Sequence, residues 1–252
     1  MNTLELADVT AEPIQVLGMS FYFDPATAER AKDLGLNVFQ FYGLGRGGVL
    51  GDVDSDVVAR AFTFFHPATI ERLWNGSRAK ADPVATAAAY VQAAYEFADR
   101  TFGAVPFDVL ATFAAAAHKV ASGVTGGHHL LVDGYRQYPV TDNPVHAAYL
   151  GAIVLRELRG CVHIDAVAEV GLTPTEACYL QDAATFKLHG YDDDDAPTLS
   201  PSLEASKVEA ETLTAAAMAH YFGVLSDTER QDLADGALAM FAALSSPVAV
   251  AK

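Results

Sequence analysis

One pattern constrains the fold of this chain more than any other: a capping residue, then a proline, then a run rich in alanine. Proline at the first position of a helix loses no intrahelical hydrogen bond, and a preceding Asp, Asn, Ser or Thr can cap the free N–H groups. The pattern occurs at Asp24-Pro25, His66-Pro67, Asp82-Pro83, Asn143-Pro144, Thr173-Pro174 and Ser200-Pro201. It predicts helices over residues 25–35, 67–74, 83–101 and 201–222, and further helices from 144 and 174. Pro106 starts another up to Gly123, and a capping box at 226–229 starts the last.

Strand signals are scarce, because alternating β-branched and aromatic residues never persist for more than about five positions. Short strands are possible at 130–132 and as a hairpin around 185–188. We therefore predict an all-α fold with, at most, a small β-hairpin wing. Three regions are expected, namely an aromatic-rich helical part (1–142), a helix-turn-helix-like unit with an acidic loop (143–199) and a C-terminal helical hairpin (200–252).

The middle of the chain carries the clearest supersecondary signal. A short helix over 162–170 is followed by Gly171, where a left-handed residue is expected after a helix end. Thr173 and Glu176 then form a capping box for a second helix. Two short helices joined by a glycine-containing turn form a helix-turn-helix, whose second helix can read the major groove of DNA. If this one does, the contacting residues are Thr173, Thr175, Tyr179 and Gln181.

The charge of the chain opposes DNA binding. Affinity for DNA comes largely from Lys and Arg, and the chain has 16 of them at a net charge of −16. The second helix of the motif has no Lys or Arg, and the acidic run 192–195 stands where a wing would approach phosphates. That run is typical of a solvated loop rather than a metal site. A helix-turn-helix scaffold that does not bind DNA is therefore the favoured interpretation, although a nucleic-acid partner is not excluded.

Four sequence blocks carry a resemblance to a known family: FYFDP at 21–25, FYGLGRGGVLG at 41–51, FTFFHP at 62–67 and LRELRGCVHI at 155–164. In this order, the blocks resemble an actinobacterial family whose members are labelled helix-turn-helix or MarR-like. The resemblance implies an all-α body with a winged-helix-like part, and it brings no catalytic residues. Residues 208–233 also look like the last two helices of MarR-type proteins, which form a dimer interface and so imply a homodimer.

The chain departs from that family at two places. Gly47-Gly48-Val49 stands where members tend to have Ala-Pro after the arginine of the glycine-rich block. Many members also carry a basic, Trp-containing segment after the motif helix, which is replaced here by Tyr191 and aspartates. The second departure further weakens the expectation of DNA binding.

Three potential cations lie in a row before the motif. If the helix that begins after Asn143 continues without a break, Arg156, Arg159 and His163 share one face. Guanidinium groups bind carboxylates through paired hydrogen bonds, so this stripe suggests an anionic ligand. The alternative is internal pairing of the arginines, with Glu157, Asp165 or Asp182 as the acids.

Two further residues could take part in a ligand site. Arg46 stands in a glycine-rich block that could form an anion-binding loop, although the block lacks the Lys-Ser/Thr of a P-loop, and the same glycines could let helices turn a tight corner. His66 could act as a general base, as a haem ligand or, more simply, as a helix cap. Many aromatic residues surround both of them in the first third of the chain, as the walls of a pocket for a planar ligand would require.

Other chemistries find little support in the sequence. His128 and His129 are adjacent and would diverge, and no Cys/His cluster exists, so no metal site is predicted. Cys161 and Cys178 fit small core positions better than redox roles. We find no nucleophile elbow and no cofactor motif. Whether the protein is an enzyme is therefore left open, with His66 and His163 as the candidate acid/base residues.

These observations lead to one main hypothesis. The chain is expected to be cytoplasmic, since it has no signal-peptide pattern at its start and no apolar run that would span a membrane. The resemblance to MarR-type proteins implies that it is a homodimer. It would bind a small aromatic or acidic molecule between the aromatic N-terminal part and the stripe on the helix after Asn143. Arg46 and Arg159 would pair with acid oxygens, Arg156 would line the site, and His66 or His163 would hydrogen-bond the ligand. The alternatives are a MarR-type DNA-binding regulator and an enzyme using His and Arg.

Overall fold

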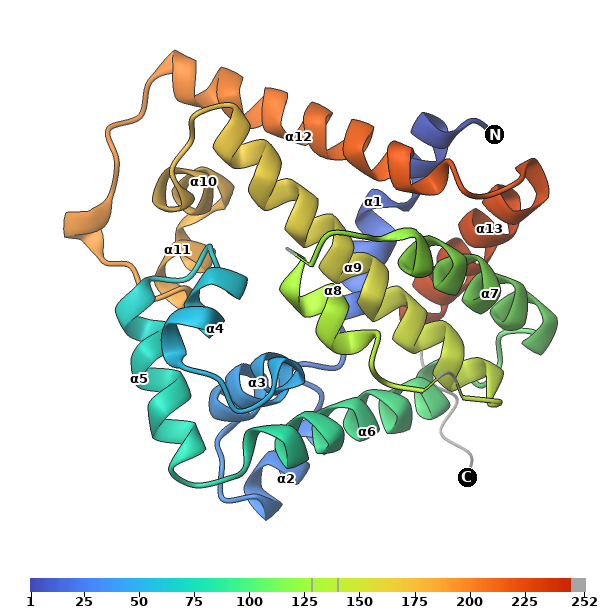
Figure 1. Cartoon of the computed structure of the whole chain (residues 1–252), viewed down its shortest axis with the longest axis horizontal. Coiled ribbons are helices and arrows are strands. Elements are labelled where there is room, and N and C mark those ends of the chain that lie inside the picture. Colours follow the sequence, from blue (N-terminus) through green and yellow to red (C-terminus); the bar gives the residue numbers. More distant parts are fainter. Residues whose placement is uncertain (128, 140, 246–252) are drawn as a thin grey trace.

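The computed structural model describes residues 1–127, 129–139 and 141–245, and this part of the chain is helical without any strand (Figure 1). Its α-helices, in chain order, are α1 (Thr3–Met19), α2 (Pro25–Asp33), α3 (Val38–Gly47), α4 (Ser55–Ala61), α5 (Pro67–Arg78), α6 (Pro83–Phe102), α7 (Phe107–Gly123), α8 (Leu130–Tyr135), α9 (Pro144–Glu169), α10 (Pro174–Gln181), α11 (Ala183–Leu188), α12 (Pro201–Phe222) and α13 (Asp227–Leu244). Two short 3-10 helices lie at Gly48–Leu50 and Asp193–Asp195. The all-α prediction is confirmed.

The proline pattern marks true helix starts. Each of α2, α5, α6, α9, α10 and α12 has proline in its first turn and a preceding side chain that accepts a backbone N–H. The capping box of α13 is also present, formed by Ser226 and Glu229. No helix among the described residues combines the length and the apolarity needed to cross a bilayer.

Both predicted strand segments are wrong. Residues 130–132 begin α8, and the segment predicted as a hairpin wing lies within α11. The Asp182 carboxylate accepts the backbone N–H of Thr185, so a helix cap immediately after α10 starts a new helix. Such a cap satisfies N–H groups that a hairpin would have to pair with another strand.

α9 is the central element of the fold. It is 26 residues long and packs against α1, α6, α7 and α12. The predicted separate helix over 162–170 is therefore wrong, because α9 passes through Gly160 without a break and ends only at Glu169. The main hydrophobic core surrounds α9 and draws on all three predicted regions, from Leu6 to Met240.

The glycine-rich block belongs to a helix and not to a loop. α3 begins with a capping box between Asn37 and Gln40 and contains Gly43, Gly45 and Arg46. A Cβ atom on Gly45 would lie 2.6 Å from the side chain of Tyr90 on α6. Of the two interpretations of this block, the anion-binding loop is wrong, and the glycines instead allow helices to pack closely.

The helix-turn-helix consists of the end of α9, a short turn and α10. Gly171 has a φ of 77°, so it occupies the predicted left-handed position, and Thr173 and Glu176 form the predicted capping box. Leu172 and Leu180 pack with Ala210 of α12 in a small second core. α10 and α11 lie side by side at one end of α9, near α4 and α5 (Figure 1).

Candidate functional site

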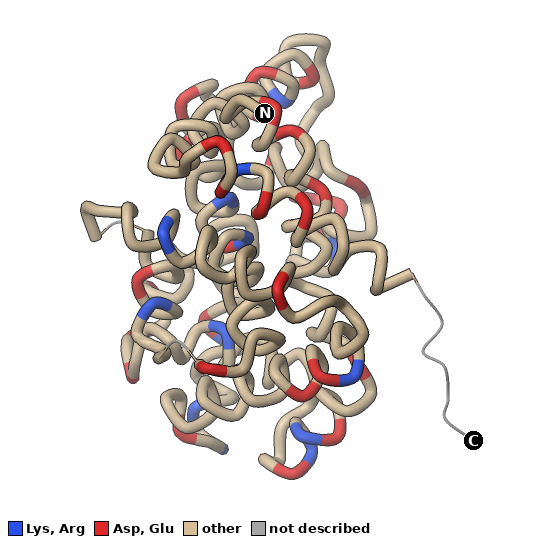
Figure 2. Tube along the Cα trace, turned by 90° about the vertical axis from the view of Figure 1, so that its right-hand side faces the viewer, with Lys and Arg blue, Asp and Glu red and all other residues tan. Residues whose placement is uncertain are grey.

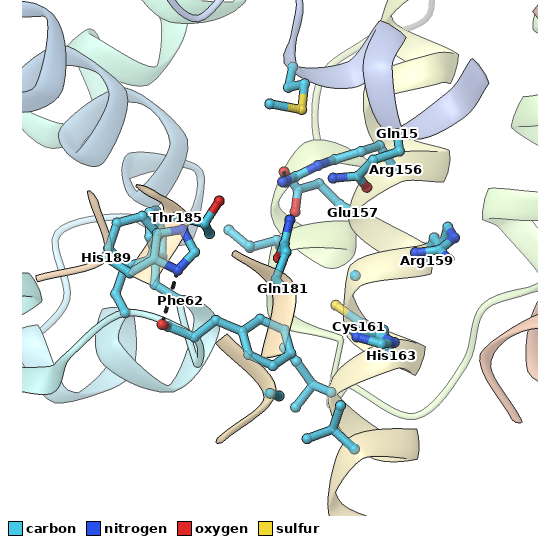
Figure 3. Close-up of a pocket in the computed structure, with 18 of the residues that line it drawn as sticks. Gln15, Phe62, Arg156, Glu157, Arg159, Cys161, His163, Gln181, Thr185 and His189 are labelled. Carbon is cyan, nitrogen blue, oxygen red and sulfur yellow. Dashed lines mark hydrogen bonds and ion pairs between the residues drawn. The ribbon is translucent and has the colours of Figure 1, made fainter. Parts of the chain in front are cut away.

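A cavity of about 690 Å³ lies between α9 and the α10–α11 pair (Figure 3). Residues of α1, α3, α8 and α12, and of the end of α4 with the segment that follows it, also line the cavity. Its lining includes four cationic side chains and three carboxylates, which are Arg46, Arg156, Arg159, Lys207, Glu12, Glu157 and Glu211. An excess of cations in the lining is unusual for a chain with a net charge of −16. The lining therefore has one more cationic than anionic side chain, although the chain as a whole is acidic.

A buried ion cluster forms one part of the cavity wall. Arg46 donates from Nε to Glu157 Oε1 at 2.8 Å and from Nη2 to Glu157 Oε2 at 2.7 Å. Its Nη1 donates to the Tyr42 hydroxyl at 3.1 Å, and the ring of Phe62 lies 4.4 Å from the guanidinium carbon. Arg46 is 7% exposed and Glu157 is 1% exposed, so this bidentate pair is almost fully removed from water.

Arg156 joins the same cluster as a second cation. Its Nη1 donates to Glu157 Oε1 at 3.0 Å, whereas its Nε is buried and has no hydrogen-bond partner in the structure. Two guanidinium groups thus share one carboxylate, and the cluster carries one uncompensated positive charge. Burial by itself raises the pKa of Glu157, but the charges of Arg46 and Arg156 outweigh this effect and hold that pKa at about 2.

A second polar cluster lies further along α9. Arg159 Nη2 pairs with Glu211 Oε2 of α12 at 2.7 Å, and His163 Nδ1 lies 2.9 Å from Thr214 Oγ1 on the same helix. Burial lowers the pKa of His163; Glu211 raises it and Arg159 lowers it further. α9 and α12 are thus joined by polar contacts that line the cavity on one side.

The three residues of the stripe predicted from the sequence therefore line the same cavity. Arg156, Arg159 and His163 all line it, together with Arg46 from α3. Internal pairing, the alternative interpretation, also occurs: Glu157 is the partner of Arg156, but Arg159 pairs with Glu211 rather than with Glu157, Asp165 or Asp182. Glu211 carries no local sequence signal that would connect it to α9, so sequence reasoning missed it.

His66 is not among the residues that line the cavity. Its Nδ1 accepts the backbone N–H of Ala68 at 3.2 Å, and its ring lies edge-on against Tyr191. This is the helix-capping role that the sequence allowed. Among the described residues, no three His, Cys, Asp or Glu side chains lie together in a way that could hold a metal ion.

α10 and α11 supply the opposite wall, where Thr185 and His189 face the Arg156–Glu157 region (Figure 3). His189 Nδ1 lies 3.1 Å from the Phe64 carbonyl oxygen, and its ring stacks on Phe65. Burial, with the charges of Arg46 and Arg156, lowers the pKa of His189 to about 4. Sequence reasoning missed His189, because no capping pattern or stripe includes it.

The four candidate DNA-contacting residues have other roles or partners in the fold. Thr173 caps α10, the ring of Tyr179 packs edge-on against Phe186, the Thr175 side chain lies beside Tyr191, and Gln181 lines the cavity. Two lysines of the neighbouring helices α11 and α12 are also engaged, Lys187 with Asp193 and Lys207 with the Leu180 carbonyl oxygen. Figure 2 shows Lys and Arg positions scattered among more numerous Asp and Glu positions.

Comparison with known proteins is consistent with the motif found in the fold. A family model described as a helix-turn-helix family matches residues 7–249. Since the match spans nearly the whole chain, the protein belongs to this helix-turn-helix family. Neither the curated proteins nor the solved structures contain a match.

Proposed function

We propose that this protein binds a small organic acid in the cavity between α9 and α10–α11, with Arg156 as the anchor of the ligand carboxylate. The proposal rests on the cluster in which Arg46 and Arg156 share Glu157. Arg156 shares the carboxylate of Glu157 with Arg46 and its side chain stays 16% exposed, so its guanidinium can take a second carboxylate from the cavity. Arg46 already donates three hydrogen bonds, so its role is to fix Glu157 beside Arg156.

The rest of the cavity fits the body of such a ligand. Its volume of about 690 Å³ lies within the usual range of small-molecule sites. The apolar part of its lining includes Phe62, Phe64, Phe65, Ile164, Val167 and Leu188. A few polar anchors in a mostly apolar wall are typical of sites that orient an aromatic or aliphatic acid. Arg159, whose charge is offset by Glu211, supplies a second cation near the other end of the site.

Calorimetric titration with matched acids and amides tests this function. Benzoate, phenylacetate, cinnamate and octanoate would be compared with the corresponding neutral amides. We expect at least one acid to bind about tenfold or more tightly than its amide, because a hydrogen bond to a charged group is stronger than a neutral one. No binding of any acid, or equal binding of acid and amide, would overturn the proposal.

Variants at two arginines provide the control. Arg156→Gln should weaken binding of the best acid by about tenfold or more, since the anchoring charge is lost. Arg100 is a matched control, because it also pairs with an acid, Asp24, but it does not line the cavity. Arg100→Gln should leave the affinity unchanged. Equal affinity of the Arg156→Gln variant and the unmodified protein would contradict the assignment of the anchor.

Membership of a helix-turn-helix family favours DNA binding as a second candidate function. The acids Glu176 and Asp182 at the two ends of α10 weigh against it, as does the engagement of Lys187 and Lys207 elsewhere. A gel-shift titration at low salt, with the DNA upstream of the coding sequence, decides between the two. Retardation that falls steeply as salt rises would establish DNA binding; no retardation would exclude it for that DNA.

A further inference from the structure

A chain of hydrogen bonds fixes which nitrogen of His163 carries the proton. The Thr214 hydroxyl donates its one hydrogen to the Ala210 carbonyl oxygen at 2.7 Å. Thr214 Oγ1 can therefore only accept from His163 Nδ1, which lies 2.9 Å away. The proton of the neutral ring is on Nδ1, and Nε2 is left as a hydrogen-bond acceptor.

The surroundings of His163 keep the ring in this neutral form. Burial lowers the pKa of His163, and the charge of Arg159 on the same helix lowers it further, whereas Glu211 of α12 at 3.8 Å raises it. The ring of Phe64 covers another side at a centroid distance of 5.7 Å. Within residues 1–127, 129–139 and 141–245, Nε2 has no hydrogen-bond partner. An acceptor on a cavity-lining side chain is thus available to a ligand.

The two ends of the site are separated by a defined length of helix. Arg156 and His163 are seven residues apart on α9, which corresponds to about two helical turns or roughly 10 Å. Between them lies Gly160, which also lines the cavity, and a Cβ atom placed on Gly160 would meet no atom within 4 Å. The wall between the two ends is therefore open at Gly160, so one molecule can extend along it.

We propose that the ligand is an apolar or aromatic acid that carries a hydrogen-bond donor, such as a hydroxyl group, at the end opposite its carboxylate. The carboxylate lies at Arg156 and the donor at His163 Nε2. This assignment rests on the proposed function and adds the chemistry of the far end. It also makes His163 the residue that distinguishes a hydroxylated acid from its unsubstituted analogue.

The probes are trans-4-hydroxycinnamate, whose carboxylate and phenol are far apart, trans-cinnamate, which lacks the hydroxyl, and trans-4-methoxycinnamate, which has no donor. We expect the hydroxylated acid to bind about three- to tenfold more tightly than either analogue, as one hydrogen bond to a partly buried acceptor would give. Equal affinity of all three acids would overturn this inference and leave the proposed function intact. Binding of none of them, with or without the hydroxyl, would count against this inference and against the carboxylate anchor together.

Two variants of His163 separate ligand recognition from folding. An Asn side chain can place an N–H where Nδ1 stands, so His163→Asn retains a donor to Thr214 but lacks the acceptor at Nε2. It should abolish the preference for the hydroxylated acid and leave cinnamate binding unchanged. His163→Gln can offer an amide oxygen near the Nε2 position and should restore part of the preference. An undiminished preference in His163→Asn would overturn the assignment, provided that its melting temperature matches that of the unmodified protein.

Discussion

Arg46 and Glu157 form a bidentate ion pair that joins α3 to α9 across 111 residues of sequence. The pair is buried, and Arg156 adds a second guanidinium to the same carboxylate. Glu157 thus pairs with two cations at once, which makes it the residue on which the electrostatics of the cavity wall depend. The same arrangement stabilises the packing of α3 on α9 and leaves Arg156 with unused hydrogen-bonding capacity.

Removal of the carboxylate should destabilise the fold strongly. Glu157→Gln leaves two buried guanidinium groups without a counter-charge, and breaking a buried pair in this way typically costs about 3–5 kcal/mol. Urea unfolding, followed by circular dichroism, measures the change. Glu96→Gln is the matched control, because Glu96 pairs with Arg30 at a side-chain exposure of 39% and should contribute at most about 1 kcal/mol. Similar losses of unfolding free energy for the two variants would show that the buried cluster contributes no more to stability than an exposed ion pair does.

The stability of the protein should also depend on pH through Glu157. Its pKa is lowered from 4.5 to about 2 in the fold, so the folded state binds its proton less readily than the unfolded chain does. The stabilisation from the ionised carboxylate is therefore complete above about pH 4.5 and is lost as the pH falls towards 2.

Glu229 has a similarly lowered pKa at the protein surface, so the pH profile of the unmodified protein alone does not isolate Glu157. The useful quantity is the difference in unfolding free energy between the unmodified protein and Glu157→Gln. This difference should be constant from pH 5 to 7 and shrink below about pH 4.5. A difference that stays constant down to pH 2.5 would contradict the lowered pKa.

Local chemistry explains which elements were predictable from the sequence. A proline in the first turn with a capping side chain before it acts within a few residues, so it marked helix starts correctly. α1 and α3 were missed although each has a capping box, Asn2 with Glu5 and Asn37 with Gln40. These signals could have been found, because the boxes need no proline to start a helix.

The site was only partly predictable, because several of its contacts join residues that are far apart in the sequence. The position of Arg156, Arg159 and His163 on one face follows from helical periodicity. The pairing of Arg46 with Glu157 and of Arg159 with Glu211 depends on how distant helices pack, and no local pattern encodes it. The same holds for His189, which lines the cavity only because α11 lies near the segment between α4 and α5.

Replacement of two helix glycines by alanine should change the stability of the protein in opposite directions. Gly45→Ala would place a Cβ atom 2.6 Å from Tyr90, and such overpacking typically costs about 1–3 kcal/mol. Gly76 lies within α5 with nothing within 4 Å, so Gly76→Ala should stabilise the protein by up to about 1 kcal/mol. Thermal melting of both variants tests the close packing of α3 on α6. Stabilisation by Gly45→Ala would show that the two helices do not approach this closely.

Gly160 offers a test of the cavity that does not change any charged group. Gly160→Ala should stabilise α9 by up to about 1 kcal/mol, since a helix interior favours alanine and the site is open. Gly160→Leu should fold equally well, but its side chain extends into the space between Arg156 and His163. We therefore expect it to weaken binding of trans-4-hydroxycinnamate by about tenfold or more, while Gly160→Ala has a small effect. Calorimetry on both variants measures this, and unchanged affinity in Gly160→Leu would mean that the ligand does not extend along this part of α9.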